Sequence, residues 1–294
     1  MKIEFYGVRG STAAPGPQTA KYGGNTSCVH IELENGHDLV LDAGTGIRML
    51  GQKLVRKSGA LNLLLSHGHW DHIQGFPFFE PIYQPNRDIH VYNSVESGDR
   101  LFSSLFEQMD GTNFPIKVED LPSNNMSKFK GIESELYERE GITLVKQSLN
   151  HPGGGVAYKI TENHVTVAYV TDNELEPPGS MHTSYDKWVN YLHGVDVLIH
   201  DAQYTEDDMP HKHGWGHSLI SQVRRLASDA EVGCLVMFHH DPDRSDAELD
   251  EIQIENEKFL KSNHAPARSI CAAEGMIITL SKPILGGKTR IEIS

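Results

Sequence analysis

The sequence predicts a mixed α/β protein in which helices cover the faces of β-sheets. Short runs of apolar and β-branched residues, bounded by turn residues, indicate buried strands. These runs lie at residues 39–41, 61–65, 165–170, 195–199 and 235–238. A helical spacing of apolar side chains indicates helices at residues 46–57, 218–230 and 247–260. Because strands and helices alternate along much of the chain, we expect a layered arrangement.

Two segments depart from this alternation. Residues 143–170 are typical of an antiparallel pair of strands. Residues 110–142 are polar and irregular, and such a stretch is either a functional arm, lid or contact surface, or a tolerated surface insertion. We expect residues 1–294 to form a single domain that carries this insertion. Ser218 is the expected N-cap of the helix at 218–230.

The charge and cysteine content narrow the class of protein. With 26 basic and 40 acidic side chains, the formal net charge is −14, which disfavours general binding to nucleic acid or to anionic membranes. The first residues lack the apolar run of a signal peptide, and no stretch of about 18 apolar residues is present to span a bilayer. The 3 cysteines are too few for a disulfide framework. We therefore expect a cytoplasmic protein with a small-molecule partner and no membrane partner.

Histidine is unusually frequent, with 17 residues, and the densest group directly follows the predicted strand at 61–65. Imidazole and carboxylate ligands at this density suit Zn²⁺, Mn²⁺ or Fe²⁺ rather than Ca²⁺. His67 and His69 can converge on one ion, whereas the adjacent Asp71 and His72 diverge and more easily serve a second ion. A polar loop with coincidental histidines is the alternative, and four ligand-type residues behind a buried strand disfavour it.

Two coordination spheres need further ligands, and the ends of later strands supply candidates. His151 lies ahead of a glycine-rich turn, Asp172 follows one predicted strand, and the neighbouring His239 and His240 follow another. Because a carboxylate has two oxygens, we expect Asp172 to bridge two metal ions. One further imidazole for each ion then gives two histidine-rich spheres that share Asp172 and a water.

These motifs resemble those of the metallo-β-lactamase-fold superfamily of dinuclear metallohydrolases. Its His-x-His-x-Asp-His signature is present, its later single ligands are matched in order, and its Asp-x-Gly element is matched at Asp42. The resemblance covers essentially the whole chain and implies an αββα sandwich of two mixed β-sheets flanked by helices. It implies two divalent transition-metal ions, with zinc favoured over manganese or iron, and a homodimer. The implied ligands are His67, His69 and His151 for one ion, Asp71, His72 and His239 for the other, and Asp172 for both.

Two further stretches resemble the ribonuclease Z branch of this superfamily. The first, around Asp201, resembles its His-Glu-Ala-Thr stretch with Asp in place of Glu, and the second, around His217, resembles its His-Ser-Thr helix start. The resemblance implies that His217 donates a proton to the leaving oxygen and that Asp201 orients His217. A carboxylate can do so because it fixes the tautomer of an imidazole and raises its basicity. Asp71 joins these two residues in the predicted catalytic set.

These parts predict a phosphodiesterase. Two cations activate a shared water and neutralise phosphate oxygens, and an alkoxide leaving group needs the proton that His217 can deliver. Several stretches look closer to bacterial phosphodiesterases with small substrates, so the leading substrate is a 3′,5′-cyclic nucleotide. A ribonuclease Z-like tRNA 3′-processing endonuclease and a thioesterase or glyoxalase-type hydrolase are the alternatives. No ligand position is missing, which disfavours a regulatory member that has lost its chemistry.

The remaining predictions concern side chains near the metal edge. Arg9 and Asn25 are candidate contacts to phosphate or base, and a simple turn between the first two strands is the alternative. The resemblance selects His239 over His240 as the metal ligand and leaves His240 as a supporting or substrate-facing residue. Outside this set, we expect an exposed turn for His164, a solvated position for His211, and either a solvated or a site-lining position for His213.

Overall fold

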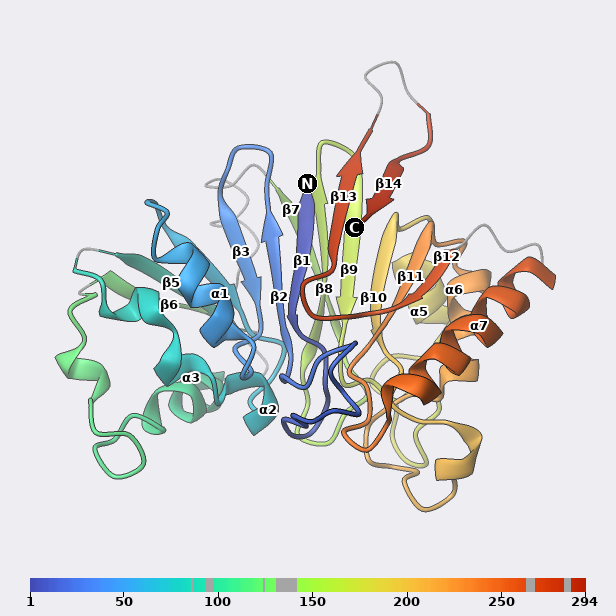
Figure 1. The fold of residues 1–294 in the computed structure, drawn as a ribbon, viewed down its shortest axis with the longest axis horizontal. Coiled ribbons are helices and arrows are strands. Elements are labelled where there is room, and N and C mark those ends of the chain that lie inside the picture. The colour runs from blue at the N-terminus through green and yellow to red at the C-terminus, as the bar shows by residue number, and fades with distance from the viewer. Residues whose placement is uncertain (86, 94–97, 124, 131–141, 263–267, 283–286) are drawn as a thin grey trace.

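The computed structural model describes residues 1–294 except 86, 94–97, 124, 131–141, 263–267 and 283–286. Two β-sheets lie face to face, with helices on both outer sides (Figure 1). The larger sheet has the strand order β14 (Arg290–Ile293), β13 (Ile277–Ser281), β1 (Lys2–Gly7), β2 (Cys28–Glu32), β3 (Asp38–Leu41), β4 (Leu61–Leu64), β5 (Asp88–Asn93), β6 (Asn125–Lys130). The smaller sheet has the order β12 (Arg268–Cys271), β11 (Cys234–Phe238), β10 (Val197–Asp201), β9 (Val165–Val170), β8 (Val156–Glu162), β7 (Thr143–Ser148).

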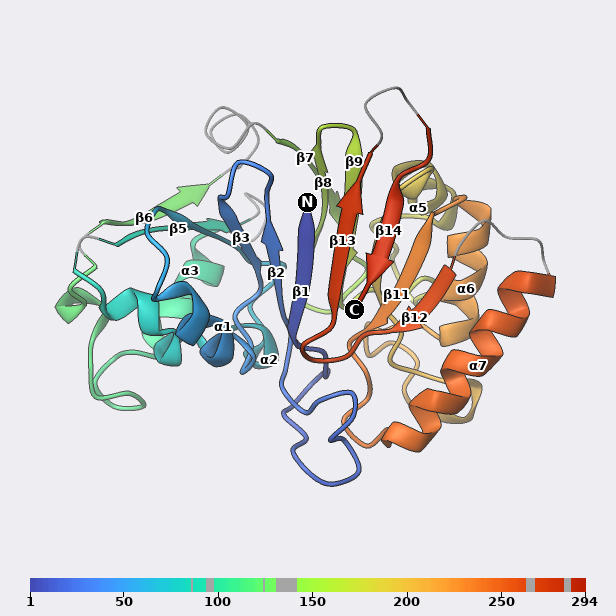
Figure 2. The same ribbon diagram turned by 45° about the horizontal axis from the view of Figure 1, so that its top comes forward.

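Both sheets are mixed, because each combines parallel with antiparallel strand pairs. Figure 2 shows one group of helices beside the larger sheet and another beside the smaller sheet. The first group is α1 (Ile47–Leu54), α2 (Trp70–Ile73) and α3 (Gly98–Glu107), and the second is α5 (Tyr185–Leu192), α6 (Ile220–Asp229) and α7 (Asp246–Ser262). The predicted sandwich of two mixed sheets flanked by helices is confirmed.

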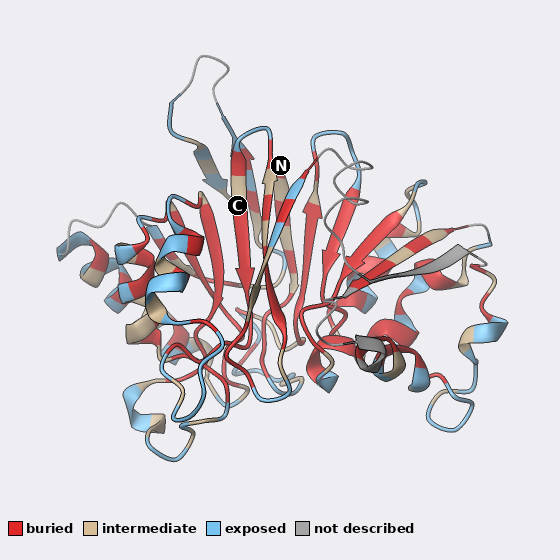
Figure 3. Ribbon diagram, turned by 180° about the vertical axis from the view of Figure 1, so that it is seen from behind, coloured by how far each residue is buried: buried red, intermediate tan, exposed pale blue. Residues whose placement is uncertain are grey.

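The apolar core has three parts, as the layers require. One cluster lies between the sheets, where Phe5 of β1 packs on Phe238 of β11 with ring centroids 6.2 Å apart. A second cluster joins the smaller sheet to α5, α6 and α7, and Trp188 is fully buried in it. A third joins the larger sheet to α1 and α3. The inner strands β2, β3, β4, β9, β10 and β11 are accordingly buried on both faces over most of their length (Figure 3), which is why several of them appear in the sequence as continuous apolar runs. Strands β1, β7, β13 and β14 are only partly buried.

Most predicted elements are confirmed, and the differences have local causes. The strand expected at 195–199 instead spans Val197–Asp201, so Asp201 is its last residue. The helix expected at 218–230 begins at Ile220, and Ser218 is not its N-cap because the Ser218 hydroxyl donates to the carbonyl of Asn173 at 2.5 Å. The antiparallel strands expected in 143–170 are present as β7, β8 and β9.

The segment 110–142 is more regular than predicted. It contains a short 3-10 helix at Val118–Asp120 and the edge strand β6, which pairs in parallel with β5. The polar composition of β6, with Asn, Ser and two Lys among its six residues, hides it from an apolar pattern. Residues 124 and 131–141 of this segment lie outside the described residues.

Candidate metal centre

Strand topology brings the predicted ligands together. β9, β10 and β11 run parallel, so their carboxyl ends lie at one edge of the smaller sheet, where Asp172 follows β9 and His239 follows β11. β7 runs in the same direction as β9, because both pair antiparallel with β8, and His151 follows it. The segment from His67 to His72 follows β4 of the larger sheet. Residues far apart in sequence thus meet at the edge shared by both sheets.

The first group of possible ligand atoms belongs to His67, His69, His151 and Asp172. Asp172 Oδ2 lies 3.5 Å from His67 Nε2 and 3.7 Å from His151 Nε2. His151 Nε2 lies 3.0 Å from His69 Nδ1. All four ligand atoms are within 4.8 Å of one another, so they surround a common point that one ion could occupy.

The second group belongs to Asp71, His72, His239 and again Asp172. His72 Nε2 lies 3.0 Å from Asp172 Oδ1 and 3.2 Å from Asp71 Oδ2. His239 Nε2 lies 3.2 Å from Asp172 Oδ1 and 3.1 Å from Asp71 Oδ2. The two oxygens of Asp172 therefore face different groups, Oδ2 the first and Oδ1 the second.

The chemistry of these atoms fits a bound cation. His72 and His239 each have Nδ1 beside an oxygen atom, so the Nε2 atoms carry lone pairs, yet they face each other at 3.2 Å and also face two carboxylates. His67 Nε2 is buried and has no hydrogen-bond partner. Such a set of acceptors without donors needs a positive charge at its centre. The family-implied divalent metal ions fit these residues.

The backbone at this edge is strained in a way that favours a functional site. Asp42, Asp172 and His239 have φ values of 59°, 49° and 59°, in the left-handed region that non-glycine residues rarely adopt. Conformations of this kind cost of order 1–3 kcal/mol each and persist where the surrounding structure enforces them. In all three residues the turn directs a side chain of the site from the end of a strand.

Asp42 organises the histidines that follow β4. Its Oδ2 accepts from His72 Nδ1 at 2.9 Å, from the Ser66 hydroxyl at 2.7 Å and from the Tyr169 hydroxyl at 2.8 Å. The Ser66 hydroxyl also lies 3.0 Å from His67 Nδ1. Asp42 therefore holds His72 directly and His67 through Ser66, as carboxylates commonly do for metal-binding imidazoles.

Gln203 and the N-terminal loop support the second group. Gln203 Oε1 accepts from His239 Nδ1 at 2.9 Å, and Gln203 Nε2 donates to the Ser11 hydroxyl at 3.2 Å. The backbone N–H of Ser11 donates to Asp71 Oδ2 at 2.8 Å. Gly10 has no room for a side chain, since a Cβ there would lie 2.4 Å from His239 Nδ1. This loop therefore fixes Asp71 and His239 relative to each other.

The first group is held from a different loop. His151 Nδ1 donates to the carbonyl of Gly216 at 3.0 Å, which directs Nε2 toward the other ligands. Glu174, which is buried, accepts from the backbone N–H groups of Gly214 and Gly216 at 2.9 and 3.0 Å. Burial lowers the pKa of His151 to about 4, so its imidazole is neutral at pH 7, as a metal ligand must be.

His217 and Asp201 form a hydrogen-bonded pair beside the second group. His217 Nδ1 lies 2.9 Å from Asp201 Oδ2, and the His217 ring stacks on His239 with centroids 5.1 Å apart. Asp201 Oδ2 also accepts from the backbone N–H of Asn173 at 3.1 Å. Burial lowers the pKa of His217, but the nearby carboxylates, first Asp201 and then Asp172 and Asp71, together outweigh burial and raise the pKa to about 9. The shorter arm of Asp, compared with Glu, therefore still reaches the imidazole.

The predicted substrate contacts need correction, because most of the polar atoms of these side chains form hydrogen bonds within the protein. Arg9 is fully buried, and its guanidinium donates to the carbonyls of Gly23, Asp241 and Arg244. His240 is 2% exposed, and its Nε2 donates to the carbonyl of Ala272 at 2.9 Å. The side chain of Asn25 donates to Glu274 Oε2 and accepts from the Thr45 hydroxyl. Arg9 and Asn25 therefore stabilise the turn between the first two strands, which was the alternative interpretation, and His240 stabilises the fold.

The positions of the other histidines agree more closely with those predicted from the sequence. His164 is exposed in the tight turn between β8 and β9, with a φ of 67°. His211 is exposed. His213 is also exposed, but it lines a cavity of about 260 Å³ together with His217. The sequence left open whether His213 is solvated or lines the site, and in the structure it is exposed and also lines this cavity.

Several supporting residues were missed by the sequence reasoning. Asp42 was noticed only as part of a resemblance, and neither Gln203 nor Glu174 was given a role. Gln203 lies two residues from Asp201, and Glu174 lies two residues from Asp172, so for these two residues proximity to a predicted site residue was the available signal. The contact partners of Gln203 and Glu174 are loops distant in sequence, which no local spacing reveals.

Comparison with known proteins gives the family. The model described as Beta-lactamase superfamily domain matches residues 37–240. The ribonuclease Z of Archaeoglobus fulgidus is 22% identical over 278 residues, which cover 81% of this chain and 87% of that protein. The chain therefore belongs to the beta-lactamase superfamily, and it is a hydrolase of the metallo-β-lactamase fold with a His/Asp cluster that could hold divalent metal ions.

Solved structures agree on the fold. The metallo-beta-lactamase fold protein YhfI from Bacillus subtilis superposes with a TM-score of 0.68 at 16% identity, covering 94% of this chain and 98% of that one. A diphosphatase from the PhnP family has a TM-score of 0.66 at 18% identity, covering 95% of this chain and 98% of that one. Among the described residues, no helix has both the length and the apolar character to cross a membrane.

Proposed function

We propose that this hydrolase is a phosphodiesterase that holds two divalent transition-metal ions and cleaves a small phosphodiester, with a 3′,5′-cyclic nucleotide as the leading candidate. The observation that carries the proposal is the pair of Asp201 and His217, 2.9 Å apart beside the ligand cluster. A phosphodiester releases a strongly basic alkoxide, which needs a proton donor. A thioester releases a much less basic thiolate, so a thioesterase has less use for this pair.

The residues divide into three tasks. His67, His69 and His151 would hold one ion, Asp71, His72 and His239 the other, and Asp172 would contact both through its separate oxygens. When bound, two divalent ions supply positive charge that neutralises the phosphate oxygens and lowers the pKa of an attacking water.

His217 is the proton donor. Its Nδ1 is occupied by Asp201, which leaves Nε2 as the nitrogen that can transfer a proton to the leaving oxygen. Asp201 favours the protonated imidazole and fixes the ring, so it acts as a positioning residue. The stacking on His239 keeps the His217 ring against the second group of ligands.

Zinc is the leading candidate for the ions, because sets of imidazole and carboxylate ligands suit zinc. Such sets also accept manganese or iron. A structural neighbour, PqqB from Methylobacterium extorquens, is described as Zn²⁺-bound.

A ribonuclease Z-like activity on tRNA is the second candidate. It is favoured by the names of the sequence relatives, which include the ribonuclease Z proteins of Archaeoglobus fulgidus and Pyrobaculum aerophilum at 22% and 26% identity. The net charge of −14 disfavours it, because a large RNA presents many phosphates to the protein surface. The small phosphodiester therefore remains the leading substrate class.

The test compares two leaving groups in the metal-loaded protein. His217→Ala should lower turnover of a 3′,5′-cyclic nucleotide on the order of 10²–10⁴-fold, but should change turnover of bis(p-nitrophenyl) phosphate much less, because p-nitrophenolate leaves without a proton. His211→Ala, at an exposed histidine, is the matched control and should leave both rates unchanged. Equal losses on both substrates would contradict the proton-donor role. Cleavage of a 3′-extended tRNA without turnover of any cyclic nucleotide would transfer the assignment to the second candidate.

A further inference from the structure

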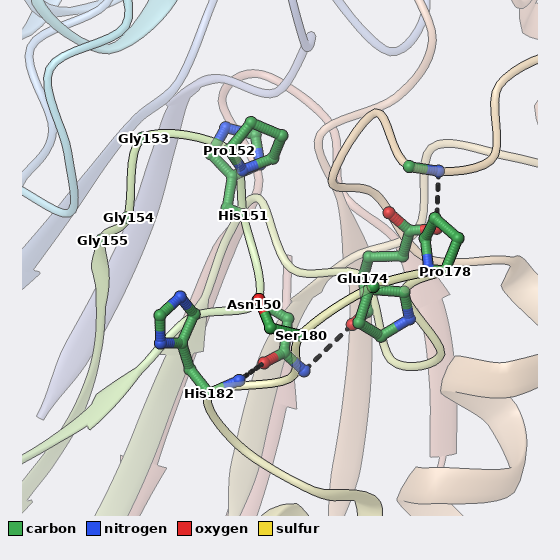
Figure 4. Close-up of a pocket in the computed structure, with 13 residues that line it drawn as sticks. Asn150, His151, Pro152, Gly153, Gly154, Gly155, Glu174, Pro178, Ser180 and His182 are labelled. Atoms are coloured by element: carbon green, nitrogen blue, oxygen red, sulfur yellow. Dashed lines mark hydrogen bonds between the residues drawn. The ribbon is translucent and has the colours of Figure 1, made fainter.

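A cavity of about 660 Å³ opens beside His151, on the side of the first ligand group (Figure 4). One wall is the turn of three glycines at residues 153–155, and another is the loop that carries Pro177 and Pro178. Ser180 and His182 complete the lining, and in Figure 4 the His182 ring lies on the side of Gly154 and Gly155, away from Pro178. Because His151 belongs both to the ligand cluster and to the lining, the cavity adjoins that cluster.

The walls of this cavity are fixed to one another through Asn150. Its Oδ1 accepts from the backbone N–H groups of His182 and Thr183, both at 2.9 Å. Its Nδ2 donates to the carbonyls of Glu174 and Thr183 at 3.1 and 2.8 Å. Asn150 is 3% exposed and directly precedes His151. The cavity is therefore preformed, as small-molecule sites usually are. One buried amide, that of Asn150, holds its walls in place relative to the ligand cluster.

The lining combines polar groups with the apolar rings of three prolines, and the residues that the structure describes there contribute no lysine or arginine. Its polar groups include the imidazoles of His151 and His182, the hydroxyl of Ser180, the amide of Asn150 and glycine backbone. Glu174 is the one carboxylate, and both of its oxygens accept from the backbone of the 214–216 loop. Such a cavity suits an uncharged polar group and disfavours a second phosphate.

We propose that this cavity binds the nucleoside of the substrate, and this inference rests on the phosphodiesterase function proposed above. The volume lies in the range of sites that enclose a small organic ligand. The apolar rings of Pro177 and Pro178 and the imidazole of His182 line the cavity and can pack against a heteroaromatic base. His182 and Ser180 supply hydrogen-bonding groups for base or sugar, so they determine specificity rather than take part in the chemistry.

The test uses two substrates with the same leaving group, thymidine 5′-(p-nitrophenyl phosphate) and methyl p-nitrophenyl phosphate. Gly179→Trp is the blocking variant, because a Cβ at Gly179 meets nothing within 4 Å and a large side chain there would fill the cavity. It should lower kcat/KM for the thymidine ester about tenfold or more, since the Trp side chain and the nucleoside would have to occupy the same space. The methyl ester, which does not need the cavity, should be hydrolysed as before.

Two further variants complete the design. Ser262→Trp, at the exposed end of α7, adds the same side chain far from the site and should change neither substrate. His182→Ala removes an exposed side chain without risk to the core and should lower kcat/KM for the thymidine ester about threefold to tenfold, the loss expected for a hydrogen bond.

The outcomes separate the two proposals. If the unmodified protein hydrolyses neither ester with zinc or manganese, the phosphodiesterase function itself is wrong. If it hydrolyses both, and Gly179→Trp and His182→Ala affect both esters equally or affect neither, the nucleoside site is wrong while the phosphodiesterase function stands.

Discussion

The two ligand groups differ in how closed they are and in what orients them. In the group of Asp71, His72 and His239 every ligand is buried, and the imidazoles are held by the side chains of Asp42 and Gln203. In the other group His69 is exposed. There His151 is held by a backbone carbonyl and lies at the wall of the 660 Å³ cavity. One side of the centre is thus enclosed and the other is open toward the cavity.

The contrast between an enclosed and an open ligand group suggests how one centre could both retain metal ions and admit a substrate. Side-chain partners of metal-binding imidazoles raise their basicity and fix their orientation, which favours retention in the enclosed group. The open group is held by a loop whose own position depends on Glu174 and which borders the cavity, so this side of the centre is the one accessible to a ligand. Asp172 joins the two groups and makes them one centre.

The largest expected effect on metal affinity comes from removing the carboxylate of Asp172, which both ligand groups share. Asp172→Ala should lower metal affinity in both groups by more than about 100-fold, because partners one step further from the metal already cost 10–100-fold. His151→Ala should lower occupancy of the open group and leave about one ion per chain. Elemental analysis of both variants after growth with zinc measures this. A single ion in the unmodified protein, or full occupancy in Asp172→Ala, would contradict the proposed pair of ions.

A smaller effect is expected from the enclosed group alone. Gln203→Leu leaves His239 Nδ1 buried without its acceptor and should weaken one metal ion by roughly 10–100-fold, while the other ion remains. Gln203→Glu, which keeps an acceptor at the same length, should recover much of the affinity. Gln52→Leu, at an exposed position of α1, is the matched control. Competition with a chelator gives both affinities, and an equal loss of both ions would mean that the two groups are not independent.

The metal-ligand candidates could be predicted from the sequence, whereas the residues that support them could not. The ligands were identifiable because they follow apolar strands, and strand order then brings His67 and His239 together. Arg9 was misassigned because an arginine near a glycine-rich loop looks the same in sequence whether it meets a ligand or, as here, three backbone carbonyls. Gln203 and Glu174 were missed because their roles depend on loops that meet only in the folded chain.

Strand β6 shows a limit of another kind. Its residues are mostly polar, and pairing with β5 at the sheet edge makes it a strand. Apolar periodicity reports burial, so it finds strands inside the sandwich and overlooks one at the edge.

The smallest expected effect concerns the open group. Glu174→Gln replaces one of two carboxylate acceptors by an NH₂ group that cannot accept from Gly214 or Gly216, so the loop that orients both His151 and His217 loosens. Losing one such bond should lower kcat by about threefold to tenfold. Metal content should stay unchanged, because every ligand side chain remains, and KM for methyl p-nitrophenyl phosphate should change little. Glu176→Gln, at an exposed carboxylate paired with Arg225, is the control and should have no effect. Loss of metal in Glu174→Gln with a normal kcat per bound metal would show that Glu174 stabilises the centre rather than positions His217, and the contrast between the two groups would then lie in exposure alone.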